Sequence, residues 1–390
     1  MEYRQQIVEG SLSKTSDDFL HKIDIVSGER YEYGKRIILR SSEIQNDNMI
    51  EQYMEFVTEI RIKYIILYIE DKFKKYRKSI SVFFKFHKER IFVNDLIDDR
   101  EYGFIKLAYR DCLGDILYKE IPVFIKDCVE DILCRVDIKI EEMMDVLNKK
   151  KEKVSRKEWH NQIVIFSQQA TGYFIHEVIG HLLEEDVYVY SKEYLHKIIS
   201  PKVTVIDDIM NYGNMIGLNT IDDEGVMLKP VTLVQNGKIR NILSLGENIN
   251  GVARRMDYTK KALPRMRCTF LKPVAKMTKN DFIKAFDDVI VVDNIYSGVS
   301  SYIDGQFSIA GNGMYLKNGM EIYYINNLII SSFIEDYLKN IIEIGNDLSI
   351  YATECSKMGH TIRVGIGGPC VCFENVNVLG DCYRYGKEFF

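Results

Sequence analysis

Glycine and proline are distributed unevenly along this 390-residue chain, and that asymmetry constrains the fold more strongly than any other feature of the sequence. Residues 1 to about 155 contain a single proline, Pro122, and few glycines, whereas glycine recurs throughout the remainder. Because these two residue types mark turns and interrupt regular elements, the first part favours long elements and the second favours short ones. Domains commonly hold roughly 150 residues. We therefore predict two domains, residues 1–155 and 156–390.

The first domain is predicted to be an α+β domain that is rich in helix. Apolar residues recur at helical spacing over residues 42–78 and again over 127–153, amid many charged residues. Between these segments, residues 79–84 and 90–93 are typical of a β-hairpin, and residues 31–40 are typical of an earlier strand.

The second domain is predicted to be mostly β. The pair Asn236-Gly237 predicts a hairpin turn, and residues 331–344, followed by Gly345, predict one long helix. The fold class is therefore α+β, with a helix-rich N-terminal α+β domain and a mostly β C-terminal domain. Strand-like runs rich in β-branched residues lie at 203–206, 230–234, 289–292 and 306–309.

Composition excludes several functional classes. The chain has 52 basic and 57 acidic residues spread along its length, so it has no basic surface of the kind that binds nucleic acid. Its apolar runs fall short of the roughly 20 residues that a membrane-spanning helix needs. The N-terminal residues have no apolar signal segment, so we expect a cytoplasmic protein. Its eight cysteines include no CxxC pair, which argues against a zinc ribbon and fits a reducing compartment.

One segment carries clear chemistry, the HExxxH motif that His176, Glu177 and His181 form. Zinc hydrolases need neutral imidazoles as metal ligands and a nearby carboxylate that is not a ligand, because this carboxylate accepts a proton from water. Two histidines and a glutamate supply these groups. A helix with structural, partly exposed histidines is the alternative. The apolar residues around the motif favour burial, and buried polar groups need partners.

The spacing of the two histidines requires a local departure from the α-helix. Residues five apart on a regular α-helix point about 140° away from each other and do not share a face. Gly180, directly before the second histidine, permits a π-type widening that would bring both rings to one metal. A third protein ligand, which could be cysteine, histidine or a carboxylate, must come from elsewhere in the chain.

The sequence at this point resembles the TldD/PmbA family of zinc metalloproteases, in particular its catalytic TldD-like branch. The resemblance covers roughly residues 155 to 380 and includes four blocks that occur in the family's order. The departures are a serine after Cys355, a histidine at 360 where glutamine is usual, and Glu185 in place of a glycine; none removes a ligand. The blocks are the HExxxH motif with Gly180, Glu184 and Asp186, then 221–225, then 264–266, then 355–369.

The resemblance implies a zinc metallopeptidase with one zinc ion per active site. His176, His181 and Cys355 would be the ligands, and Glu177 would be the general base that activates the water at the zinc. A set of two histidines and one cysteine leaves a fourth tetrahedral position for water and the scissile carbonyl. The oxyanion stabiliser stays unassigned.

The family implies substrates that are small, unfolded or leader-type peptides, bound in extended form by strand addition. Gly365, Gly367 and Gly368 are candidates for close approach of that peptide, and plain turn glycines are the alternative. Asp223 and its acidic neighbours could orient a histidine ligand, although a turn at Gly225 explains them equally well. His360 is a further candidate, as a rival ligand or a proton donor.

Family members commonly work as two related chains, one of which lacks the metal motif. The resemblance therefore implies a dimer, either a heterodimer with a metal-less PmbA/TldE-like subunit or a homodimer.

Two functions other than a zinc metallopeptidase stay open. The chain could be a non-catalytic peptide-binding subunit of such a pair, or a cysteine hydrolase with Cys355 as nucleophile and a histidine as its base.

Overall fold

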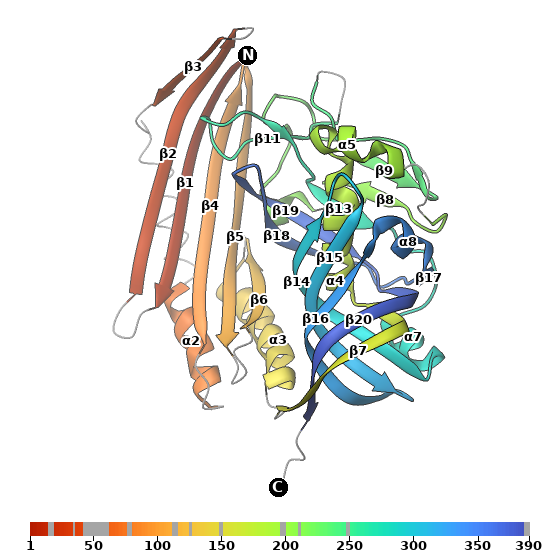
Figure 1. Cartoon of the computed structure of the whole chain (residues 1–390). Helices are drawn as coiled ribbons and strands as arrows, with labels where there is room; N and C mark the ends of the chain where they lie inside the picture. The colour runs from red at the N-terminus through yellow and green to blue at the C-terminus, as the bar shows by residue number, and fades with distance from the viewer. Residues whose placement is uncertain are drawn as a thin grey trace. The chain divides into compact units, whose positions relative to one another are not determined.

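The computed structural model describes residues 1–14, 19–33, 36–41, 62–75, 80–110, 116–124, 127–147, 151–195, 200–209, 212–246 and 250–385. The chain divides into two compact units, each of which is described by itself (Figure 1). Within the described residues, no helix combines the length and the apolar character needed to span a membrane. Unit 1 contains Met1–Lys149, Asn214–Gly225 and Arg255–Lys261, and unit 2 contains Lys150–Gly213, Val226–Arg254 and Ala262–Phe390.

Unit 1 is built on an antiparallel sheet with helices on one of its faces. In the described part of the chain, six strands pair in the order β3-β2-β1-β4-β5-β6. Helices α2 (Ile62–Lys75) and α3 (Val129–Leu147) pack against this sheet. The strands are β1 (Glu2–Lys14), β2 (Phe19–Tyr33), β3 (Arg36–Ser41), β4 (Ser81–Val93), β5 (Leu96–Arg110) and β6 (Ile116–Val123).

The core of unit 1 follows from the apolar periodicity of its helices and strands. The apolar stripe of α2 lies against buried residues of the strands, and that of α3 contributes to the same cluster. Burial alternates along β4, as expected for a strand with one covered face. The cluster includes Ile65, Ile69 and Phe73 of α2, Ile132, Val136 and Ile140 of α3, and Val8, Phe84 and Phe86 of the sheet.

The structure corrects several predicted elements of unit 1. The hairpin expected at 79–84 and 90–93 is the single strand β4, because its intervening charged residues find partners on β1 and β5. The strand expected at 31–40 is instead the end of β2 and the start of β3, which pair as a hairpin. The helix expected at 127–153 ends at Leu147. Helix α2 confirms the described part of the helix expected at 42–78, and the other residues of that prediction lie outside the described residues.

Unit 2 contains two larger sheets with a helical segment between them. In the described residues one sheet has the order β10-β9-β8-β13-β19-β18, and the other has the order β16-β15-β14-β7-β20-β17. In the second sheet β16 also pairs with β20, so five of its strands close on themselves. Helix α4 (Gln168–Ile175) packs against both β19 of the first sheet and β14 of the second. Buried apolar residues of both sheets and of α4 form the largest core.

The bounds of the elements of unit 2 are as follows. The first sheet contains β8 (Val205–Asp207), β9 (Val231–Gln235), β10 (Lys238–Ile239), β13 (Cys268–Leu271), β18 (Ser349–Lys357) and β19 (His360–Gly368). The second contains β7 (Lys151–Phe166), β14 (Asp288–Ser300), β15 (Gln306–Lys317), β16 (Met320–Phe333), β17 (Ile341–Ile344) and β20 (Val371–Tyr385). The remaining elements are α5 (Glu185–Leu195), α6 (Gly213–Ile216), which crosses the unit boundary, α7 (Lys279–Ala285), α8 (Ile334–Lys339) and the short pair β11 (Ala253–Arg254) and β12 (Leu263–Pro264).

The α+β class is confirmed, and most of the predicted strands of unit 2 are present. Strands β8, β9, β14 and β15 contain or overlap the predicted runs, and Asn236-Gly237 forms the turn between β9 and β10 with both φ angles positive. The long helix predicted over 331–344 is wrong. Residues 331–333 end β16, α8 is short, and 341–344 form β17, whose β-branched residues pair with β20.

Candidate metal centre

The two motif histidines lie at the ends of a π-helical turn that continues α4. Ser167 caps the start of α4 by accepting a hydrogen bond from the backbone N–H of Ala170. The π-helical turn η1 covers His176–Gly180, and the backbone N–H of His181 donates to the carbonyl oxygen of His176, five residues earlier. A 3-10 turn, η2 (His181–Leu183), follows directly. The predicted widening of the helix is confirmed, and the two imidazole ring centroids lie 4.7 Å apart.

Gly180 is required here by packing as well as by helix geometry. A Cβ atom at this position would lie 2.0 Å from Sδ of Met266. Met266 is itself buried. A larger residue at 180 would therefore displace either the end of the Met266 side chain or the π-helical turn.

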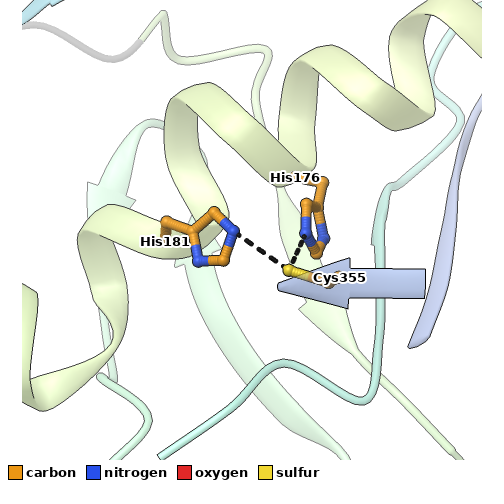
Figure 2. Close-up of side chains that lie close together, drawn as sticks. All are labelled: His176, His181 and Cys355. Carbon is orange, nitrogen blue, oxygen red and sulfur yellow. Dashed lines mark hydrogen bonds between the residues drawn. The ribbon is translucent and has the colours of Figure 1, made fainter. Parts of the chain in front are cut away.

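Cys355 of β18 completes a cluster of three possible metal ligands (Figure 2). Its Sγ lies 3.2 Å from Nε2 of His176 and 3.4 Å from Nε2 of His181. Cys355 is 7% exposed, His176 2% and His181 5%. Sulfur and nitrogen ligands of one tetrahedral zinc ion stand about 3.6 Å apart, given ordinary zinc–sulfur and zinc–nitrogen bond lengths. The three donor atoms therefore fit a zinc ion, with one coordination position left over.

Strand register explains why Cys355 faces the histidines. In the β18–β19 hairpin Cys355 pairs with Ile362 and Lys357 pairs with His360, and all four side chains are buried. The residues before and after Cys355 in β18, Glu354 and Ser356, are exposed. This alternation is the period-two pattern of a strand, and it directs the thiol and the lysine toward the same covered side.

Glu184 joins the site from the other side of His181. One of its carboxylate oxygens lies 2.8 Å from Nδ1 of His181 and accepts a hydrogen bond from Nζ of Lys357 at 2.7 Å. Its other oxygen accepts the backbone N–H of Met266 at 3.0 Å. Such a carboxylate orients the ring of a ligand histidine and leaves Nε2 free for the metal. Glu184 belongs to one of the sequence blocks that resemble the family, but the sequence alone does not predict its role. The sequence signal for that role is an acidic residue three positions after the second histidine.

Arg265 holds the Cys355 hairpin against this network. Its guanidinium is buried and donates hydrogen bonds to the carbonyl oxygens of Cys355 at 3.0 Å and His360 at 3.2 Å. Its Nε lies 3.7 Å from a carboxylate oxygen of Glu184. The arginine therefore links both strands of the hairpin to the carboxylate that orients His181. The sequence pattern alone does not indicate this role for Arg265.

The electrostatics of the cluster favour a thiolate. Burial opposes ionisation of Cys355, but hydrogen bonds and charge interactions with His176 and His181 outweigh it and lower the pKa of the thiol to about 5. Burial likewise opposes a charged His181, yet Glu184 and Cys355 raise its pKa to about 10. Burial also opposes ionisation of Glu184, but His181, Lys357 and Arg265 lower its pKa to about 2. The thiolate is the form of cysteine that binds a metal.

His176 presents one of its ring nitrogens to the thiol of Cys355. Within the described residues its buried Nδ1 has no hydrogen-bond partner, while its Nε2 points at the thiol. Among the described residues, the group of close His, Cys, Asp and Glu donors consists of His176, His181 and Cys355. His360 is buried on the same strand face but does not belong to that group.

Glu177 lies next to the cluster without belonging to it. Its carbonyl oxygen accepts a hydrogen bond from the hydroxyl of Ser300 at 3.0 Å. Its side chain runs along β14, where a Cβ atom at Gly298 would be 3.2 Å from Cγ of Glu177. The residue is partly exposed and directly follows His176 in the sequence. A general base must likewise reach water without being a metal ligand.

The three glycines that are candidates for substrate approach contact other segments of the chain. Gly365, Gly367 and Gly368 lie inside β19, which pairs with β13 on one side and β18 on the other. A Cβ atom at Gly172 of α4 would lie 2.9 Å from the backbone nitrogen of Gly367, and one at Gly368 would lie 2.5 Å from the Thr171 side chain. Gly367 and Gly368 therefore lie against α4, whereas Gly365 lies against Cys268 of β13, and all three are within a strand.

Asp223 lies in unit 1, whereas the histidines and Cys355 lie in unit 2. Its carboxylate binds Nη1 of Arg100 at 2.5 Å and the backbone N–H of Arg255. The neighbouring Asp222 accepts the backbone N–H of Glu224, and Gly225 has a φ of +82°. The turn explanation therefore describes this segment, and the partner of His181 is Glu184 instead.

Comparison with known proteins shows the family of the part of the chain that carries this cluster. Residues 161–380 match the family model described as the PmbA/TldA metallopeptidase C-terminal domain. The chain therefore belongs to the TldD/PmbA family, as the resemblance predicted.

Relatives with metalloprotease names cover the same part of the chain. A metalloprotease TldD homolog from Buchnera aphidicola (subsp. Acyrthosiphon pisum) is 29% identical over 232 residues, which cover 56% of this chain and 48% of that protein. A zinc metalloprotease TldD homolog from Saccharolobus solfataricus is 28% identical over 231 residues and covers 56% of this chain and 51% of that protein. The chain thus spans about half the length of the curated relatives that it matches.

The fold as a whole is also known from crystallography. The crystal structure of TldE from Thermococcus kodakarensis has a TM-score of 0.63 to this chain and covers 97% of it and 95% of that chain. The sequence identity is 13%, so the likeness describes the fold alone.

Proposed function

We propose that this chain is a zinc metallopeptidase that hydrolyses peptide bonds of small, unfolded or leader-type peptides. The observation that carries the proposal is the convergence of two imidazole nitrogens and one thiol sulfur within 4.8 Å of one another, beside Glu177. The zinc metalloprotease name of the Saccharolobus solfataricus relative supports the choice of metal.

His176, His181 and Cys355 would hold the zinc ion. The ion would supply Lewis-acid polarisation of water and of the scissile carbonyl. Glu177 accepts a proton from the attacking water and passes it to the leaving amine as the carbon–nitrogen bond breaks. Glu184 keeps the ring of His181 in place during these steps, and Arg265 keeps the Cys355 hairpin in place.

Strand β18 is the proposed place for an extended substrate. In the described part of its sheet, β18 is the outermost strand after β19, and it carries Cys355. A peptide that pairs with an outer strand is held by its backbone, so many sequences would be accepted. The central position of β19 argues for β18 as the docking strand and against a direct role for the three glycines of β19.

We further propose that the chain works in the cytoplasm as part of a dimer, with a related metal-less subunit or a second copy as partner. A reducing compartment keeps Cys355 available as a thiolate ligand. The fold likeness to a protein named TldE supports a partner of this kind.

A cysteine hydrolase is the second candidate, and one observation favours it. The thiol of Cys355 lies 3.2 Å from an imidazole nitrogen, and its pKa is lowered to about 5. A nucleophilic cysteine has these properties. The complete His-His-Cys donor set favours the metal, and sensitivity to a chelator separates the two candidates.

The proposal is tested by zinc content and by cleavage of unstructured peptides. The purified chain, alone and co-expressed with a candidate partner, should hold one zinc ion and cleave peptides until a chelator removes the metal. Cys355→Ala should lose the zinc, whereas Cys372→Ala, a change at another buried cysteine, should keep it. Glu177→Gln should keep the zinc and lose activity by about 10²- to 10⁴-fold.

Three outcomes would contradict parts of this proposal. Activity that survives a strong chelator but not a thiol alkylator would identify a cysteine hydrolase. Undiminished cleavage by Glu177→Gln would remove the assigned base. A zinc-loaded chain that binds peptides and cleaves none, in either assembly, would be a non-catalytic peptide-binding subunit.

A further inference from the structure

The closed part of the second sheet of unit 2 has an interior that its strands share. Strand β16 pairs with β20, which completes a ring of β7, β14, β15, β16 and β20. The largest core contains buried residues from every strand of this ring, so these residues point into it. They include Val164 of β7, Val292 of β14, Ile309 of β15, Ile325 of β16 and Val378 of β20.

Three aromatic rings extend this interior toward the start of β7. The side chains of Trp159 and Tyr315 pack against the core, and their ring centroids lie 6.0 Å apart although β14 separates their strands. Tyr315 stacks on Tyr323 of β16, with 6.0 Å between the ring centroids and 22° between the ring planes. The three rings therefore form one aromatic layer beyond the aliphatic core.

Two cations converge on the hydroxyl of Tyr323. Nζ of Lys157 donates a hydrogen bond to this hydroxyl at 3.0 Å and lies 4.1 Å from the centroid of the same ring. Nη2 of Arg384 donates to the hydroxyl at 3.5 Å. Lys157 belongs to β7 and Arg384 to β20, so two strands bring positive charge to one phenol oxygen.

No carboxylate balances these two charges within the described residues. In that part of the chain, the side chains of Lys157 and Arg384 interact with the shared phenol and form no salt bridge. The carboxylates nearby have other partners. Asp381 lies 3.7 Å from Nζ of Lys153, and Asp288 accepts the hydroxyl of the stacked tyrosine of β15 at 2.9 Å. Two like charges beside one neutral acceptor repel each other, and an anion between them would replace this repulsion by attraction.

The chemistry of this cluster matches an oxyanion. Arg384 is exposed and Lys157 is half-buried, so both can meet a ligand from solvent, whereas Tyr323 is 8% exposed and fixed in the aromatic layer. An ammonium and a guanidinium offer several N–H donors and no acceptor, and the planar guanidinium can bind two oxygens of one anion. Hydrogen bonds between such donors and an ionised oxygen are stronger than those to a neutral hydroxyl.

We propose that Lys157, Tyr323 and Arg384 form a binding site for an oxyanion, either a carboxylate or a phosphate group, separate from the proposed metal centre. Residues 158–166 of β7 lie between Lys157 and Ser167, the cap of the helix that leads to the histidines. A strand of this length spans roughly 30 Å, at about 3.3 Å per residue. The site therefore depends neither on zinc nor on the proposed peptidase function.

Trp159 provides the readout, because it is the single tryptophan of the chain and lies two residues from Lys157. The full chain is titrated with inorganic phosphate and, separately, with acetate. The ionic strength is held constant, so that screening does not change during the titration. At least one anion should change the fluorescence of Trp159 along a saturable curve, and calorimetry should give the same dissociation constant. The anion that saturates at the lower concentration identifies the oxyanion that the site prefers.

A double variant and a matched control test the assigned side chains. Lys157→Gln with Arg384→Gln should weaken anion binding by at least about 10-fold, because both charge-assisted hydrogen bonds are lost. Arg156→Gln removes one charge from the adjacent, exposed residue, whose side chain points to the opposite face of β7. This control should bind the anion within about 2-fold of the original chain, because an exposed charge outside the site is largely screened.

Phosphate can also bind zinc, so a second control separates the two places. Cys355→Ala removes a proposed zinc ligand, and we expect it to bind the anion as the original chain does. Absence of saturable binding of both anions by fluorescence and by calorimetry would overturn the inference. Equal affinities of the double variant and the original chain would also overturn it. Binding that Cys355→Ala loses and the double variant keeps would assign the anion to the metal centre instead.

Discussion

Glu184 is the residue on which most contacts of the proposed metal site converge. Its carboxylate meets the ring of His181, the ammonium of Lys357 and the backbone N–H of Met266, and its side chain is fully buried. Three segments far apart in sequence therefore depend on one charged group. A buried carboxylate is stable only when charged or polar partners surround it, and these partners are the elements that must meet to form the site.

Replacing Glu184 by glutamine should weaken zinc binding by about 10- to 100-fold, as loss of an orienting carboxylate usually does. The amide can still contact His181, but it cannot neutralise the buried Lys357. Glu185→Gln is the matched control, because it removes the same charge from the adjacent, exposed residue. Competition with a chelator of known affinity measures both variants. Equal affinities would show that Glu184 does not support the metal site.

At the scale of elements, the close packing of α4 on β19 positions the histidines. The backbone of β19 comes so close at Gly367 that no side chain fits at Gly172 of α4. Helix α4 leads directly into the π-helical turn, and β19 holds β18 with Cys355 at its other edge. The distance between the histidines and the thiol therefore depends on this contact between a helix and a strand.

Gly172→Ala should destabilise unit 2, although helix propensity alone would favour alanine by about 1 kcal/mol. A Cβ atom would lie 2.9 Å from the backbone nitrogen and 3.0 Å from the Cα of Gly367, and backbone atoms in a paired strand cannot turn away. We expect a net loss of roughly 1–3 kcal/mol and weaker zinc binding. Thermal unfolding of the chelated and zinc-loaded variant checks both. A melting temperature equal to or above that of the original chain would contradict the prediction.

At the scale of the whole molecule, the chain crosses between its two units several times. Residues 214–225 and 255–261 belong to unit 1, although the segments around them belong to unit 2. Within unit 1, Arg100 of β5 binds Asp223 and the carbonyl oxygen of Ile221, and it also binds Asp98. A buried arginine on the sheet therefore holds one of the two inserted segments in place.

Arg100→Met should destabilise unit 1 by about 3–5 kcal/mol, because it leaves the buried carboxylates of Asp98 and Asp223 without their cation. Arg90→Met is the matched control. Arg90 lies on neighbouring β4 and pairs with Asp99, but the two side chains are 38% and 52% exposed, against 3% for Arg100. The control should cost about 1 kcal/mol or less. Urea unfolding, followed by hydrogen exchange in β4 and β5, distinguishes them. Equal losses would refute the buried-cluster explanation.

Features that depend on neighbours in the chain could be predicted from the sequence alone. The HExxxH spacing and Gly180 predicted a widened helical turn, and the turn is present because its hydrogen bond spans only five residues. The Asn236-Gly237 turn and most strands of unit 2 were also predictable from local residue preferences. The resemblance to a family added Cys355, which no local pattern could connect with His181, 174 residues away.

Features that depend on distant segments follow from packing and not from local pattern. The helix predicted over 331–344 is reduced to α8, because 331–333 belong to β16 and 341–344 pair with β20. The glycines of β19 pack against α4, β13 and β18, and no pattern in β19 alone could reveal these contacts. The roles of Glu184 and Arg265 likewise depend on long-range contacts. Packing free energy is shared among segments far apart in sequence, so it overrides local preference wherever the two disagree.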